Sequence, residues 1–287
     1  MQRYLGLLLS ICCLVLSSAF SQADTLEHIK EKGTLRIAVY KDFPPYSYVD
    51  GGQLKGFDVE LGRAIAEKLG LSTDYMQIVA GENTDDDLRN AIWKGHYLGG
   101  GTADVMLRVP YDATYAEKND KVSIFAPYAQ EEIVLAYDPA KIPTLFNLQI
   151  LTNHKVGVET DSISSFFLTG IMGGILTKSV THYLDFMEAV DDLKAGKLSA
   201  VMGMRSQVES RLADKMDAFK IEAIPMRGMN SAWQVGLAVT ADNSELAKTL
   251  TVVMNTLRQE GVLKTLANKY HVTPVEPSEK QAATTNN

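Results

Sequence analysis

The sequence predicts an α/β protein made of two lobes. Two segments, 86–107 and 186–203, show the same order of helix, glycine break and apolar strand. An earlier strand and helix precede each of them, so each unit looks like part of a parallel sheet with a right-handed crossover. Two further apolar runs, Glu131–Asp138 and Ala232–Thr240, fit connections that cross between the lobes.

The first unit opens with the alternating run Leu35–Val39, which predicts a strand, followed by an aromatic loop stiffened by two prolines. Apolar residues then recur at helical spacing over Phe57–Leu69, and Gly70 ends this helix. The acidic run 85–87 begins the next helix, where carboxylates suit the positive end of the helix dipole.

The second unit predicts a strand over Lys155–Val158 and a helix over Ser162–Leu168. After the second hinge run, a helix capped by Asn243 or Ser244 extends to about Arg258. Gly261 breaks it, and a short final helix follows.

One block of the first unit carries a family resemblance. Residues 56–69, GFDVELGRAIAEKL, fill every position of the signature of the bacterial solute-binding proteins of family 3. The resemblance implies the type II periplasmic binding protein fold, whose two lobes, joined by a two-strand hinge, close on a small solute. It places residues 24–132 and 238–272 in lobe 1, and 133–237, with the hinge strands, in lobe 2.

The N-terminus predicts export. Arg3 precedes an apolar core, and small residues end at Ala23, so residues 1–23 are expected to be a cleavable signal peptide and the mature protein periplasmic. Both cysteines, Cys12 and Cys13, lie inside this segment, so disulfides are not expected. The polar residues 273–287 are expected to be a disordered tail.

Charge narrows the classes of partner. The chain has 28 Lys and Arg against 35 Asp and Glu, which disfavours nucleic acid and anionic lipid as partners. After the signal no apolar run is long enough to cross a bilayer. We expect a monomer whose partner is a small-molecule ligand.

Ligands of open α/β sheets bind where strands end and connections diverge. This rule selects eight candidate ligand-binding residues: Asp42, Phe43, Tyr46, Met106, Arg108, Thr160, Ser162 and Met204. The resemblance implies that Phe43 and Tyr46 form an aromatic wall of the cleft, although aromatic clusters are also commonly packing.

Two of these positions leave alternatives open. Arg108 is either a surface residue paired with Asp112 or a guanidinium that holds an acidic ligand. Thr160 and Ser162 either cap a helix or grip a ligand carboxylate at its start, as the resemblance implies.

The sequence departs from the amino-acid-binding members of the family. Their Thr-x-x-Arg motif, whose arginine holds the α-carboxylate, is missing after Arg108, and Met204 stands where they carry an aspartate for the α-ammonium. An ordinary amino-acid receptor is therefore not expected.

The glycine-rich segment 95–102 is longer than the usual family connection. With Trp93, His96 and Tyr97 it forms a partner surface, a lid over the ligand or a solvated loop. It lacks the Lys-Ser/Thr of a phosphate-binding loop.

No metal site, cofactor or catalytic motif is predicted, because the histidines are isolated and no nucleophile elbow occurs. The leading hypothesis is therefore a non-enzymatic receptor for a small polar or anionic solute, with an ABC-type transporter as its candidate partner. The first alternative is an accessory protein of a periplasmic quinoprotein (methanol) dehydrogenase, because the altered cleft and the 93–107 segment resemble such a branch of the family. The second is a dehydratase-like enzyme.

Overall fold

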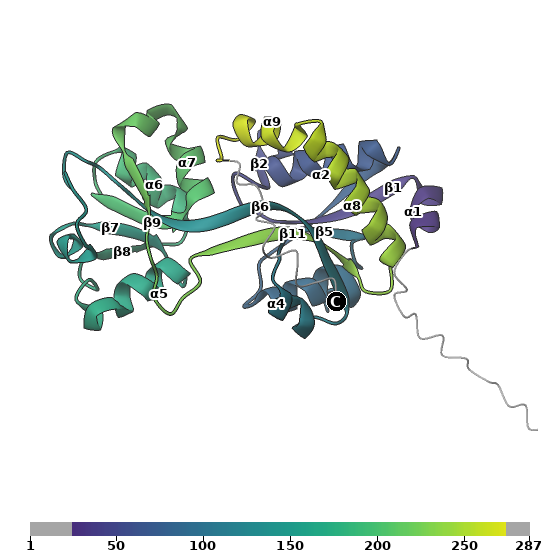
Figure 1. The fold of residues 1–287 in the computed structure, drawn as a ribbon, viewed down its shortest axis with the longest axis horizontal. Helices are drawn as coiled ribbons and strands as arrows, with labels where there is room; N and C mark the ends of the chain where they lie inside the picture. Colours follow the sequence, from purple (N-terminus) through teal and green to yellow (C-terminus); the bar gives the residue numbers. More distant parts are fainter. Residues whose placement is uncertain (1–24, 274–287) are drawn as a thin grey trace, which may run out of the picture.

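A computed structural model of the chain describes residues 25–273. Two α/β lobes lie side by side along the long axis, and two long strands run between them (Figure 1). The predicted fold class is therefore confirmed. The expected signal peptide lies outside the described residues, as does the expected tail except for Thr273.

One continuous sheet passes through both lobes. Its order is β4 (Ser72–Ile78), β1 (Thr34–Tyr40), β5 (Val105–Pro110), β11 (Ala232–Thr240), β6 (Val122–Tyr137), β9 (Ala200–Met204), β7 (Val156–Glu159) and β8 (Val180–Tyr183), while β10 (Lys220–Ala223) also pairs with β6. Strands β4, β1 and β5 are parallel in lobe 1, and β9, β7 and β8 are parallel in lobe 2.

Strand β6 connects the two lobes. It pairs with β11 as far as Glu132 and with β9 from Ile133 onward. A single strand thereby belongs to the sheet in both lobes, which suits a hinge.

In each lobe, helices cover both faces of the sheet. Lobe 1 carries α1 (Leu26–Lys32), α2 (Phe57–Lys68), α3 (Thr84–Leu88), a π-helical turn (Arg89–Trp93), α4 (Ala113–Lys118), α8 (Ser244–Gln259), α9 (Val262–Lys269) and the hairpin β2 (Tyr48–Asp50) and β3 (Gln53–Lys55). Lobe 2 carries α5 (Ile163–Gly170), α6 (Phe186–Lys194), α7 (Arg205–Leu212) and three 3₁₀ turns (Leu148–Asn153, Ile171–Gly174, Ala213–Ala218). Each lobe buries apolar side chains on both faces of its sheet.

The first glycine of the signature block has a visible structural reason. Gly56 has φ +131°, and a Cβ there would lie 2.1 Å from the carbonyl oxygen of Tyr46. The backbone N–H groups of Phe57 and Asp58 donate to the carbonyls of Pro45 and Tyr46. This contact holds the start of α2 against the aromatic loop and brings Asp58 close to Tyr46.

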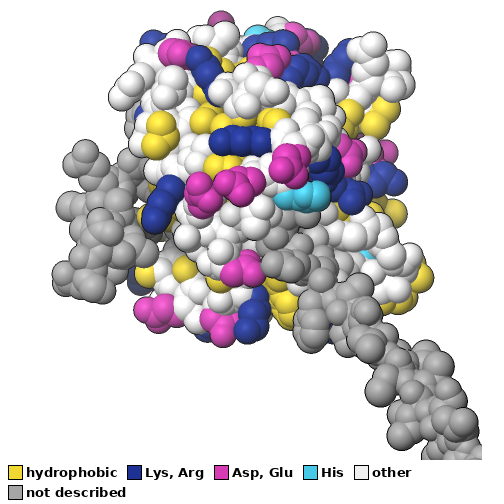
Figure 2. Space-filling view, turned by 90° about the vertical axis from the view of Figure 1, so that its right-hand side faces the viewer, with side chains coloured by type: hydrophobic (Ala, Val, Ile, Leu, Met, Phe, Trp, Pro, Cys, Tyr) yellow, Lys and Arg dark blue, Asp and Glu magenta, His cyan; other side chains and the backbone are white. Residues whose placement is uncertain are grey.

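The end of lobe 1 shows acidic, basic and hydrophobic side chains interspersed, as on a solvated surface (Figure 2). Among the helices within 25–273, none is both long and apolar enough to cross a membrane.

Candidate functional site

A cleft separates the lobes beside the hinge strands. Tyr40, Phe43 and Arg108 line it from lobe 1, Asp161 and Met204 from lobe 2, and Trp233 from hinge strand β11. It encloses about 1190 Å³ of space, part of which is open solvent. The cleft lies where β1, β5, β7 and β9 end, which is where sheets of this kind bind ligands.

Arg108 lies at the base of this cleft and is only 7% exposed. Its Nε lies 3.4 Å from Oδ2 of Asp58, and its Nη2 lies 3.7 Å from Oε2 of Glu131. Its Cζ lies 3.0 Å from the ring centroid of Tyr46 and 5.7 Å from that of Phe43. The guanidinium is thus held by two carboxylates and an aromatic face.

The two carboxylates have further partners. Asp58 accepts a hydrogen bond from the hydroxyl of Tyr128 at 2.8 Å, and Glu131 accepts one from the hydroxyl of Tyr46 at 3.1 Å. Burial raises the pKa of Asp58, although Arg108 and Tyr128 act to lower it. Because these two buried acids lie within 4 Å of the guanidinium, they balance the charge of Arg108 within the protein.

The alternative in which Arg108 is a surface residue paired with Asp112 is therefore wrong. Asp112 is the N-cap of α4 and accepts from the backbone N–H of Tyr115 at 2.8 Å. Strand β5 also continues through Arg108 to Pro110 instead of ending at Leu107, which carries the arginine inward.

Further acids line the cleft. Asp87, Glu82 and Asp161 are present, with Lys41 as a second cation. Asp87 accepts from the hydroxyl of Tyr40 and the backbone N–H of Gly81, and burial raises its pKa. The lining therefore carries more acidic than basic groups.

Of the eight predicted ligand-binding residues, three line this cleft: Phe43, Arg108 and Met204. The other five, Asp42, Tyr46, Met106, Thr160 and Ser162, do not line it. Asp42 is exposed and its carboxylate lies 3.8 Å from Nζ of Lys41. Met106 is fully buried in the core of lobe 1. Asp42 follows the first predicted strand and its side chain is exposed, whereas Met106 lies within the next predicted strand and its side chain is in the core.

Thr160 and Ser162 both hydrogen-bond to backbone groups of lobe 2. Ser162 is the N-cap of α5, accepting from the backbone N–H of Ser165 at 3.1 Å and donating to the carbonyl of Glu159 at 2.7 Å. The hydroxyl of Thr160 donates to the carbonyl of Tyr183 at 3.0 Å. The capping role predicted for Ser162 is confirmed.

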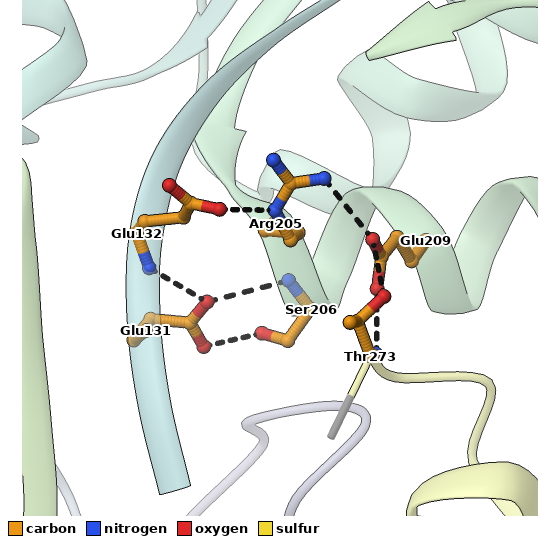
Figure 3. A network of polar contacts seen from close by, with 6 residues as sticks. All are labelled: Glu131, Glu132, Arg205, Ser206, Glu209 and Thr273. Atoms are coloured by element: carbon orange, nitrogen blue, oxygen red, sulfur yellow. Dashed lines mark hydrogen bonds and ion pairs between the residues drawn. The ribbon is translucent and has the colours of Figure 1, made fainter. Parts of the chain in front are cut away.

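A polar network joins the lobes at the hinge (Figure 3). We call it the hinge network; it consists of Glu131, Glu132, Arg205, Ser206, Glu209 and Thr273. The Ser206 hydroxyl donates to Glu131 at 2.5 Å, and the Ser206 backbone N–H donates to the same carboxylate at 3.3 Å. Glu131 therefore contacts the start of α7 in lobe 2 as well as Arg108 in lobe 1.

The rest of the hinge network continues along α7. Arg205 donates to Glu132 at 2.5 Å and to Glu209 at 3.2 Å. These partners were missed in the sequence, where the Glu131–Glu132 pair at the start of an apolar run was the only signal.

The 95–101 loop presents apolar side chains to solvent. Tyr97 is 88% and Leu98 77% exposed. His96 accepts from the backbone N–H of Leu98 and its ring lies 4.4 Å from that of Tyr97. Trp93 is exposed at the end of the π-helical turn. In the described part of the chain, no group of His, Cys, Asp and Glu side chains could hold a metal ion.

Comparison with known proteins agrees with this architecture. Residues 35–273 match the bacterial extracellular solute-binding proteins, family 3. The chain belongs to this family. Family 3 relatives include the L-cystine-binding protein TcyJ of Escherichia coli K12, 22% identical over 88% of each chain. They also include the L-arginine-binding protein of Pseudomonas aeruginosa, 26% identical over 82% of this chain and 87% of the relative.

A cyclohexadienyl dehydratase of Pseudomonas aeruginosa matches only in part, at 42% identity over 21% of this chain and 23% of the enzyme. Among solved structures, an ancestral cationic amino acid solute-binding protein superposes with a TM-score of 0.68 at 19% identity, over 85% of this chain and 98% of that one. An L-cysteine receptor of Neisseria gonorrhoeae gives a TM-score of 0.57 at 21% identity, over 86% and 93%. These structures share the two-lobed fold.

Proposed function

We propose that this family 3 protein binds a small polar, uncharged solute in the cleft between its lobes and delivers it to an ABC-type permease. The observation that carries the proposal is the buried, charge-balanced environment of the Arg108 guanidinium. Its Nε and Nη2 are buried at the base of the cleft and have no hydrogen-bond acceptor among the described residues, while Asp58 and Glu131 balance its charge. Because the charge of Arg108 is already balanced, the base of the cleft suits a polar solute that brings no charge of its own.

The charge of the lining argues against an anionic solute. A carboxylate at Arg108 would also lie beside Asp58 and Glu131, and like charges in a desolvated site repel strongly. The sequence had left an anion open because it did not show these two acids around the arginine. Phe43 and Trp233 offer an apolar wall for the solute body.

Free α-amino acids also fit poorly, although the relatives named above bind them. Met204 lines the cleft from lobe 2 at the position where, by the resemblance, amino-acid-binding members carry an aspartate for the α-ammonium. The α-carboxylate would lie beside Asp58 and Glu131, which already balance Arg108, and leaving it uncompensated in a closed cleft costs several kcal/mol.

The test is native mass spectrometry of the protein purified from its own periplasm, followed by thermal unfolding with uncharged polar solutes, carboxylates and the standard amino acids. An uncharged solute at 100 times its Kd should stabilise the protein by about 2.7 kcal/mol. Phe43→Ala should weaken this binding, and the exposed Val79→Ala should not. Stabilisation by carboxylates or amino acids alone would contradict the proposal.

A second candidate is an accessory role for a periplasmic quinoprotein dehydrogenase. The observation that favours it is the exposure of Tyr97 and Leu98 on the long loop. Co-purification with a dehydrogenase that is lost in Tyr97→Ser would support this role, whereas solute binding would be unchanged in that variant.

A further inference from the structure

The surroundings of the Arg108 guanidinium have the chemistry of a ligand site for a cation. The ring of Tyr46 covers one face of the guanidinium, and Phe43 stacks on Tyr46 with 5.7 Å between centroids. The carboxylates of Asp58 and Glu131 lie at its nitrogens. An aromatic face combined with carboxylates is a preferred environment for guanidinium groups.

The backbone of strand β5 is distorted at this residue. Gly236 and Ala238 of β11 pair with Val109 and Met106 of β5, so Leu237 lies opposite both Leu107 and Arg108. This is a β-bulge, and bulges re-aim side chains. Arg108 itself has φ +63°, in the left-handed region that favours glycine.

We propose that Phe43, Tyr46, Asp58 and Glu131 form a guanidinium site that the protein fills with its own Arg108 side chain. The bulge inserts the arginine, so the native protein excludes a cationic solute from this part of the cleft. Arg108 is thereby a specificity-determining residue, and its removal opens a site for an alkylguanidinium. The proposal rests on the proposed function only in taking this cleft as the solute site.

The decisive variant is Arg108→Gly. Glycine adopts φ +63° without strain. The substitution therefore removes the side chain while the backbone can keep the conformation of the β-bulge. The probe is n-propylguanidinium, which replaces every heavy atom that the substitution removes. We expect one saturable site by isothermal titration, and a rise in Tm of roughly 5 °C at a hundredfold excess over Kd.

Three controls separate this site from general effects. The uncharged n-propylurea has a similar shape and should not bind. The wild-type protein should not respond, because Arg108 fills the site. Arg108→Met should not respond either, because its uncharged side chain fills the space that the propyl chain of the probe would need.

If Arg108→Gly fails to fold alone, refolding with and without n-propylguanidinium gives the readout, and recovery of the folded protein only with the cation supports the proposal. The proposal is overturned if n-propylguanidinium neither binds nor rescues folding, or if wild type and Arg108→Met respond equally. None of these measurements uses the natural solute, so their failure would leave the proposed function standing.

Discussion

Thr273 donates two hydrogen bonds to Glu209, from its backbone N–H at 2.7 Å and from its hydroxyl at 2.8 Å. Thr273 follows α9 of lobe 1, whereas Glu209 lies on α7 of lobe 2 (Figure 3). Residues of α7 and α9 line a small seam that shares Glu131 with the cleft. The contact therefore links the two lobes across the hinge. It lies between α7 and α9, which do not line the cleft.

Glu209→Ala should shift the lobes toward closure over the cleft. Closing a cleft on one side of a hinge separates the elements on the other side, and this substitution removes the hydrogen bonds that resist that separation. Each bond to a charged group contributes about 1.5–3 kcal/mol. Spin labels at Val79→Cys and Leu184→Cys, both exposed positions on opposite lobes, should report a shorter or broader distance distribution.

The matched control for this prediction is Asp214→Ala. Asp214 pairs with Lys194 inside lobe 2, so its loss should leave the distance between the labels unchanged. Cys12 and Cys13 are replaced by serine in all variants. An unchanged distribution in Glu209→Ala would show that the contact does not restrain the lobes.

Arg108→Met should destabilise the protein strongly. Removing one partner of a buried ion pair leaves an uncompensated charge, here on Asp58 and Glu131, and costs about 3–5 kcal/mol. Arg211→Met removes an arginine from an ion pair with Asp191 that is nearly half exposed, and should cost at most about 1 kcal/mol. Urea unfolding of both variants makes the comparison, and equal losses would refute the buried role of Arg108.

Much of the fold was readable because it rests on local patterns. Helix α2 and strand β11 were predicted from apolar spacing and flanking breaks. Strand β4 was missed because its sequence, STDYMQI, is largely polar. The first half of β6 was also missed, since Pro127 is unusual within a strand.

The site was less predictable because its contacts come from the tertiary structure. The position of Arg108 after an apolar strand was visible, but its direction depends on the pairing of β5 with β11. Asp58 was present in the signature block, yet only the fold shows that it meets Arg108. Glu131 comes from a third element, and no spacing in the sequence links the three residues.

Ser162→Ala should lower stability without changing solute affinity. The Ser162 hydroxyl caps α5 through Ser165 and donates to the Glu159 carbonyl, so its loss should cost about 1 kcal/mol. Thermal unfolding and titration with the solute that co-purifies test both parts. A large loss of affinity with little loss of stability would instead identify Ser162 as a ligand contact.

Glu159 and Glu60 should give opposite dependences of stability on pH. Burial, together with Asp185, raises the pKa of Glu159 above its ordinary 4.5, so the folded state holds this proton longer and stability falls as pH rises from 4.5 through the raised pKa. Hydrogen bonds from Lys269 and Tyr270, against an opposing effect of burial, lower the pKa of Glu60, so its contribution is present above 4.5 and is lost as pH falls through the lowered pKa. Unfolding measured between acidic and neutral pH should therefore show Glu159→Gln gaining stability relative to wild type as pH rises, and Glu60→Gln losing it. If both differences had the same sign, at least one of these carboxyl environments would be wrongly assigned.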